Sequence, residues 1–223
     1  MKKLFIIANW KSNKTIEETE KWLHDLSEGL NKENINLGDK KIIIAPSFIS
    51  LEHANYCAKN LKFPVEFAAQ DISAFDEGAY TGEINGRQIK ELANYVIIGH
   101  SERRKYFGET DELIGQKVSI ATRHDLAPIF CIQNENTPIP HGAEIVAYEP
   151  VFAIGSGHPD TPENAEEMSK SIKKELGDIP VLYGGSVVPE NVKSFTSMPN
   201  IEGVLVGGAS LDSHKFLEII KNA

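Results

Sequence analysis

Eight short apolar runs recur along the chain, and each is continuous instead of alternating with polar residues. In chain order they are KLFIIAN (3–9), KIIIAP (41–46), VEFAAQ (65–70), YVIIGH (95–100), APIFCI (127–132), EIVAYE (144–149), PVLYGG (180–185) and EGVLVGG (202–208). Strands that are buried on both faces have this pattern, as in parallel sheets covered by helices. The pattern therefore predicts eight buried, parallel strands.

Amphipathic segments lie between these runs and predict helices. The first opens with Thr15 and carries Glu18 three residues later, which is the spacing of a helix-capping box. Its large apolar residues fall on one helical face: Trp22, Leu23, Leu26 and Leu30. Residues 110–124, 161–176 and 210–221 have the same amphipathic character.

Strands that alternate with helices in this way favour a closed (β/α)8 barrel, and an open doubly wound sheet is the alternative on the pattern alone. No linker or low-complexity tract divides the 223 residues, so we expect one barrel domain over residues 1–223. Only residues 133–143, which include two prolines, connect the fifth and sixth runs. Because a crossover needs roughly 10–12 residues and usually a helix, we expect that helix to be short or missing.

The charge of the chain limits the classes of partner it can bind. With 41% hydrophobic and 25% charged residues the composition is that of an ordinary globular protein, and the formal net charge is −9. This charge argues against a general binder of nucleic acid or of anionic membranes. No apolar run approaches the roughly 18 residues that span a bilayer. A site for an anion must therefore be local, built from backbone N–H groups or a placed lysine.

The cysteines and histidines give no sign of a metal or cofactor. Cys57 and Cys131 lie far apart, and we expect two small buried side chains in a reducing cytoplasm. The seven histidines have no HxxxH or HxH spacing. No glycine motif for a nucleotide follows the first run, so we expect no metal and no cofactor.

Titratable residues stand where several runs end, and in such a barrel the active site lies at the carboxyl ends of the strands. Glu149 ends the sixth run and precedes an apolar loop with glycines at positions 155 and 157. A solvated surface carboxylate is the plain interpretation. A buried general base is the functional one, since a closing apolar loop would remove water from the carboxylate.

Two other strand ends carry candidate groups. His100 precedes SERR, which has the composition of a helix start, and the positive end of a helix favours a neutral imidazole that donates to a substrate oxygen. A structural histidine is the alternative. Lys11 is a candidate fixed cation for an oxyanion or phosphate, Asn9 is a strand-end turn residue, and Glu102 is an expected ion-pair partner for a nearby lysine or arginine.

The seventh and eighth runs both end in a Gly-Gly pair, which is followed by Ser186 in one case and by Ala209 in the other. We expect a helix to follow each pair. Small residues at such a place let a phosphate approach backbone N–H groups, and phosphate sites after strands seven and eight recur in barrels.

These residues belong to motifs that resemble one family over essentially the whole chain. The motifs are NWK (9–11), DEGAYTGE (76–83), GHSERR (99–104), GETDE (108–112), AYEPVFAIGSG (147–157), LYGGSV (182–187) and VGGASL (206–211). In this order they resemble the triosephosphate isomerases, whose fold is the TIM barrel.

The resemblance implies an intramolecular oxidoreductase that interconverts dihydroxyacetone phosphate and D-glyceraldehyde 3-phosphate in glycolysis and gluconeogenesis. By this resemblance Glu149 is the base, His100 the neutral electrophile, Lys11 the cationic substrate-binding residue and Asn9 its neighbour. The phosphate-binding positions that it implies are Gly155, Ser186, Gly207 and Gly208.

The resemblance also implies a homodimer. In the family the loop that corresponds to residues 71–83 inserts into the partner, so Thr81 would lie near the partner's site; a solvent-exposed loop is the alternative, and tetramers also occur. The chain departs from the family at Phe152, at Ser156 and at His158-Pro159, which bears on loop closure.

Two other functions have weaker support in the sequence. A Schiff-base aldolase would need a buried lysine at a strand end, and the end of the sixth run carries Glu149 instead. A catalytically silent barrel would bind phosphate ligands without turnover, and its only support is the short connection at 133–143 and the altered hinge at His158-Pro159.

Overall fold

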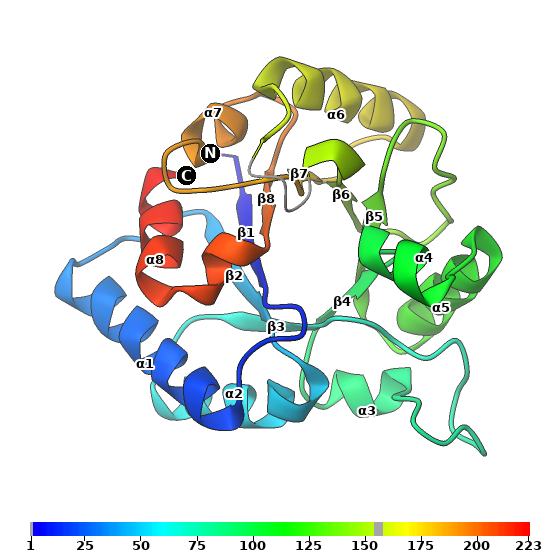
Figure 1. The fold of residues 1–223 in the computed structure, drawn as a ribbon, viewed down its shortest axis with the longest axis horizontal. Coiled ribbons are helices and arrows are strands. Elements are labelled where there is room, and N and C mark those ends of the chain that lie inside the picture. Colours follow the sequence, from blue (N-terminus) through cyan, green and yellow to red (C-terminus); the bar gives the residue numbers. More distant parts are fainter. Residues whose placement is uncertain (1, 154–157) are drawn as a thin grey trace.

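The computed structural model describes residues 2–153 and 158–223, and the chain forms a closed barrel (Figure 1). The strands are β1 (Leu4–Asn9), β2 (Lys40–Ala45), β3 (Glu66–Ala69), β4 (Tyr95–Ile98), β5 (Ala127–Ile132), β6 (Ile145–Tyr148), β7 (Val181–Tyr183) and β8 (Gly203–Val206). Each strand is parallel to its neighbours, and β1 pairs with β8 in the register Phe5 to Gly203. This pairing confirms the (β/α)8 barrel and rules out the open sheet.

Helices surround the barrel as an outer ring (Figure 1). They are α1 (Ile16–Lys32), α2 (Phe48–Asn60), α3 (Gly86–Lys90), α4 (Ser101–Phe107), α5 (Asp111–Arg123), α6 (Pro162–Leu176), α7 (Val192–Thr196) and α8 (Ser213–Asn222), with 3-10 turns η1 (Val151–Ala153) and η2 (Gly208–Leu211). Thr15 and Glu18 form the expected capping box at the start of α1.

The connection between β5 and β6 has no helix anywhere in residues 133–144, all of which the structure describes. Local hydrogen bonds hold this segment: the N–H of Gln133 donates to Thr137 Oγ1, and the N–H of Thr137 donates to the Asn134 carbonyl. Ile139 and Ala143 pack against the core where a helix would otherwise lie. The expected missing helix is therefore confirmed.

Apolar residues fill two separate layers, and this explains the continuous apolar runs. In β1, Phe5 and Ile7 belong to the cluster inside the barrel, while Ile6 and Ala8 belong to the cluster between the strands and the helices. Successive side chains of a strand point to opposite faces, so a strand that is covered on both sides must be apolar at every position.

One detail after β7 differs from the sequence-based expectation. No helix follows Ser186 directly, because α7 begins at Val192. Val188 precedes Pro189, and a residue before proline is pushed toward an extended conformation. The Asn191 side chain closes this turn, since its Oδ1 accepts from the N–H of Val188 and its Nδ2 donates to the Ser186 carbonyl.

The segment after β8 agrees better with the expectation, since the 3-10 turn η2 begins directly at Gly208. The helix α8 itself starts at Ser213 and not at residue 210. None of the helices in the described residues is both long and apolar enough to cross a bilayer.

Candidate active site

A pocket of about 220 Å³ opens at the carboxyl ends of the strands. Its walls come from the ends of β1, β4, β6, β7 and β8, and its lining residues include Asn9, Lys11, His100, Glu149, Ser186, Gly207 and Gly208. Those residues are candidates from the sequence, and the structure brings them together. Glu102 is not part of the lining but pairs with Lys11. Gly155 lies outside the described residues, and Thr81 lies on an exposed connection.

The alternation of side chains along a strand explains why Glu149 and Asn9 both face the pocket. Inside β6, Ile145 and Ala147 face the barrel interior, so the next residue of the same parity is Glu149. The same alternation in β1 runs from Phe5 and Ile7 to Asn9. Both β1 and β6 thus place a polar residue on the inner face at the point where the apolar filling of the barrel ends.

His100 does not follow this parity, and a glycine accounts for the difference. Gly99 has φ of +75°, a conformation that side chains other than glycine rarely adopt. The chain therefore leaves the strand abruptly, and His100 becomes the N-cap of α4.

The Glu149 carboxylate is buried, with only 1% of the residue exposed. Its Oε1 lies 2.9 Å from His100 Nε2, and its Oε2 accepts a hydrogen bond of 3.0 Å from the backbone N–H of Ser101, the first residue of α4. Cys131 lies nearby, and burial, together with the negative charge of Glu149, raises the pKa of its thiol well above the usual value. The pocket therefore holds a desolvated carboxylate with both oxygens partnered.

Hydrogen bonds assign the neutral form of His100. The backbone N–H of Glu102 donates to Nδ1 over 3.2 Å, so Nδ1 carries no proton. The proton is then on Nε2, which donates to Glu149. An imidazole held in this way can donate a hydrogen bond to a substrate oxygen without a positive charge.

Lys11 is held in a left-handed backbone conformation with φ of +54°. Its N–H donates to Asn9 Oδ1 over 3.1 Å, and its carbonyl accepts from Gln70 Nε2 over 2.9 Å. Its ammonium lies 2.5 Å from Glu102 Oε1. Hydrogen bonds therefore fix the backbone of Lys11, and the ion pair with Glu102 fixes its ammonium group. Gln70 was missed from the sequence, although it is the polar residue that ends the third apolar run.

Glycines shape the opposite wall of the pocket. A Cβ on Gly184 would lie 3.0 Å from Glu149 Cγ and 3.1 Å from the Tyr148 carbonyl, so a larger residue would displace the carboxylate. A Cβ on Gly208 would meet nothing within 4 Å, which leaves that backbone open to the pocket. Ser186 Oγ donates to the Ala153 carbonyl over 2.6 Å and so holds η1 to the pocket wall.

A buried network fixes the segment that returns from the loop after β6. The N–H of Asp160 donates to the Tyr183 hydroxyl over 2.8 Å, and the Tyr148 hydroxyl donates to Asp160 Oδ2 over 3.3 Å. We call these three residues the tyrosine clasp. Burial and the charge of Asp160 raise the pKa of Tyr148 and of Tyr183 to about 12. By contrast, Phe152 at the start of the loop is 66% exposed.

The tyrosine clasp was missed from the sequence. Its members are far apart along the chain, and each alone has the pattern of an ordinary strand or loop residue. The one available signal was that Tyr148 and Tyr183 each come shortly before a candidate residue at the end of a strand.

Comparison with known proteins gives a consistent result. The family model described as Triosephosphate isomerase matches residues 4–144 and 138–223. The triosephosphate isomerase of Mesomycoplasma hyopneumoniae (strain 7448) is 40% identical over 247 residues, with all of both chains covered. That of Roseiflexus castenholzii is 37% identical, covering 99% of this chain and 97% of the relative. That of Thermus thermophilus is 36% identical over 256 residues, with all of both chains covered. These alignments are longer than 223 residues, so the relatives carry segments that this chain lacks.

Proposed function

The chain belongs to the triosephosphate isomerase family, and we propose which of its residues carry out the reaction. The enzyme is an aldose–ketose isomerase of glycolysis that interconverts dihydroxyacetone phosphate and D-glyceraldehyde 3-phosphate. Each turnover moves a proton between two neighbouring carbons and another between their oxygens. The pocket must therefore supply a base for carbon and a proton donor for oxygen.

Glu149 is the base in this proposal. Its carboxylate takes a proton from carbon 1 of dihydroxyacetone phosphate, and the electron pair of the broken C–H bond forms the double bond of an enediolate. The carboxylic acid then returns its proton to carbon 2. Burial supports this role, because a desolvated carboxylate is a stronger base than one in water.

His100 polarises the carbonyl oxygen through its Nε2–H and transfers protons between the two oxygens. In the structure this N–H is occupied by Glu149 Oε1. A substrate carbonyl that takes the N–H also releases that carboxylate oxygen, so binding itself would free the base. The positive charge of Lys11 stabilises the developing oxyanion.

Substrate phosphate binds the backbone N–H groups near Gly207 and Gly208, with Ser186 beside them. These positions line the pocket, and the open side of Gly208 supports the assignment. Because the whole chain is negative, these local dipoles and Lys11 are the groups that can attract a dianion. Gly155 is the further candidate that lies outside the described residues.

We also propose that the enzyme acts as a cytoplasmic homodimer that uses the loop of residues 71–83, with Thr81 near the partner's site. Residues 75–83 are all exposed in the single chain. Phe75 and Tyr80 stack with ring centroids 4.3 Å apart, so this loop presents an ordered apolar tip to solvent. Such a tip suits insertion into a second copy.

The observation that carries the mechanism is the buried contact of 2.9 Å between Glu149 Oε1 and His100 Nε2. The test is isomerisation of glyceraldehyde 3-phosphate, coupled to reduction of the dihydroxyacetone phosphate formed, in the native enzyme and in Glu149→Gln. We expect kcat to fall about 10³-fold in the variant, which is within the usual contribution of a general base.

Glu167→Gln on the exposed side of α6 is the matched control and should keep native activity. Equal activity of Glu149→Gln and the native enzyme would disprove the role of the base. A folded native protein that binds phosphate ligands without turnover would instead favour the silent barrel. Trapping of a covalent adduct by borohydride would favour the aldolase.

A further inference from the structure

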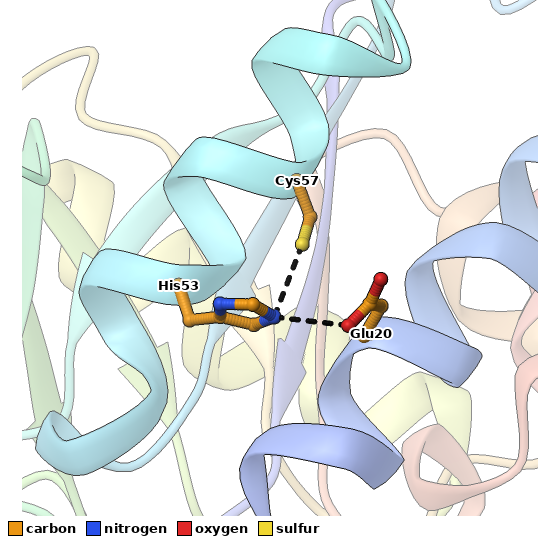
Figure 2. Close-up of side chains that lie close together, drawn as sticks. All are labelled: Glu20, His53 and Cys57. Atoms are coloured by element: carbon orange, nitrogen blue, oxygen red, sulfur yellow. Dashed lines mark hydrogen bonds and ion pairs between the residues drawn. The ribbon is translucent and has the colours of Figure 1, made fainter.

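Three side chains with metal-binding atoms meet on the outside of the barrel, away from the catalytic pocket. Glu20 comes from α1, and His53 and Cys57 come from α2 (Figure 2). None of them lines the pocket that holds Glu149. We propose that they bind one Zn²⁺ ion at the seam between these helices, with water as the fourth ligand.

The distances fit a tetrahedral zinc site. His53 Nε2 lies 3.3 Å from Glu20 Oε2 and 3.3 Å from Cys57 Sγ, and all three ligand atoms lie within 4.8 Å of one another. Zinc bonds of about 2.0–2.3 Å at tetrahedral angles separate neighbouring ligand atoms by about 3.3–3.6 Å. Two of the three separations therefore agree already, and the third lies within 4.8 Å.

Helix geometry keeps the ligands together. His53 and Cys57 are four residues apart on α2, so they lie one above the other on the same face. α1 packs along α2 and carries Glu20 to that face. The three ligands therefore stand on regular elements, which position a metal site better than loops do.

The metal-free cluster cannot satisfy all its contacts at once. Both contacts end on the same ring nitrogen of His53, as Figure 2 shows. If Nε2 carries a proton, it can donate fully to one partner only. If it carries none, it faces the Glu20 carboxylate with a lone pair. A cation between the three atoms would accept the lone pair and pair with both anions.

The chemistry of the ligands selects the ion. A thiolate, an imidazole and a carboxylate suit zinc, whereas Mg²⁺ and Ca²⁺ prefer oxygen ligands alone. On binding, the Cys57 thiol loses its proton to the solvent, and two negative ligands then neutralise the dication. Cys57 is buried, while the Glu20 side chain is 52% exposed, so water and the ion can enter from the Glu20 side.

Binding can be measured by equilibrium dialysis of the chelator-stripped enzyme against micromolar Zn²⁺, followed by metal analysis. We expect one Zn²⁺ per chain. Glu20→Gln, His53→Gln and Cys57→Ser should each weaken the affinity at least tenfold. Co²⁺ in place of zinc should give a thiolate-to-cobalt charge-transfer band that Cys57→Ser abolishes.

Glu52→Gln and His24→Gln are matched controls, because both are exposed residues of the same two helices and should leave the affinity within twofold. Isomerase activity reports folding in every variant, since the ligands lie outside the pocket. Glu20, which is exposed, and His53, which is half-buried, keep the test valid if Cys57→Ser fails to fold. The proposal is wrong if the native enzyme binds no zinc, if the ligand variants bind like the controls, or if the cobalt spectrum lacks the thiolate band.

Discussion

Lys11 combines a rare backbone conformation with a fixed head group. Its φ of +54° costs free energy for a residue with a side chain. Two hydrogen bonds hold it there: the Lys11 N–H donates to Asn9 Oδ1, and Gln70 Nε2 donates to the Lys11 carbonyl. The ion pair with Glu102 fixes the ammonium as well. A cation placed in advance does not have to reorganise when charge develops on the substrate, which is the main advantage of electrostatic preorganisation.

Replacement of this cation should lower catalysis more than replacement of its partner. We expect Lys11→Met to lower kcat/KM about 10³-fold, because removal of one placed group at an oxyanion typically costs 10²–10³-fold. Glu102→Gln keeps the cation but loosens it, so a fall of about tenfold is expected. Steady-state kinetics of both variants provide the measurement.

Lys62→Met is the matched control, because Lys62 is exposed and has φ of +51°, in the same region as Lys11. It should retain native kinetics. Native kinetics in Lys11→Met would contradict the role of the charge.

Single functional residues could be recognised in the sequence where they differ in polarity from their neighbours. Glu149, His100 and Lys11 are polar groups at the ends of apolar runs, and the family motifs identify them further. Gln70 and Asp160 could not be assigned in the same way, because their roles depend on partners far away in the chain. The zinc ligands share that difficulty, since Glu20 lies on a different helix from His53.

Helix starts were predictable where a threonine caps them. Thr15, Thr110 and Thr161 each accept a hydrogen bond from a backbone N–H in the first turn of the following helix. The shortest helices, α3, α4 and α7, have too few residues for an apolar period to be read. The start of α7 was expected directly after the Gly-Gly pair, but Pro189 keeps the chain extended there and α7 begins at Val192.

The N-cap of α8 should make stability depend on pH. Asp212 accepts from the backbone N–H groups of Lys215 and His214, and these bonds lower the pKa of its carboxyl. Because the pKa is lowered on folding, the Asp212 cap stabilises the fold fully at a pH above the unfolded pKa of about 3.9. This stabilisation is lost as the pH falls through the pKa of Asp212 in the folded protein. Urea unfolding should show that Asp212→Ala costs about 1 kcal/mol at pH 7 and less in acid.

Asp212→Asn should cap the helix at both pH values, because its amide oxygen accepts the same bonds without titrating. Asp178→Ala, a fully exposed site, controls for the loss of a charge. An equal cost of Asp212→Ala at both pH values would contradict the assignment.

The tyrosine clasp holds Asp160, which lies just before α6 in the connection that follows β6. Tyr148→Phe removes the hydrogen bond to Asp160 Oδ2, and Asp160→Ala also removes the acceptor for Asn164. A looser loop should exclude water less well, so the enediolate should lose phosphate more often. We expect kcat to fall several-fold and phosphate release per turnover to rise.

Phosphate release separates this role from a purely structural one, because general destabilisation would lower activity without changing the ratio of products. Tyr95→Phe is the control, since its hydroxyl contacts Lys41 at the amino end of β4. An unchanged ratio in Asp160→Ala would refute the clasp as a determinant of closure.

For the whole molecule, the connection between β3 and α3 projects beyond the ring of helices (Figure 1). If it inserts into a second copy, sedimentation equilibrium at micromolar concentration should give twice the chain mass. Tyr80→Asp places a charge on the apolar tip and should shift the enzyme to the monomer, with a loss of activity.

Tyr56→Asp is the matched control, because Tyr56 is an exposed tyrosine on α2. It should sediment like the native enzyme. A monomeric native enzyme would refute the dimer.

Because the strands form a closed ring, a chain with the same strands in the same circular order could begin at another strand and form the same barrel. β8 pairs with β1 as each strand pairs with the next, and Leu4 and Ala223 border the same surface pocket. Among the described connections between successive strands, that from β5 to β6 is the one without a helix. A circular permutant that joined the present ends and opened there would cut no helix. In this permutant Glu149 would precede His100 along the chain, while the two side chains would still face each other across the same few ångströms.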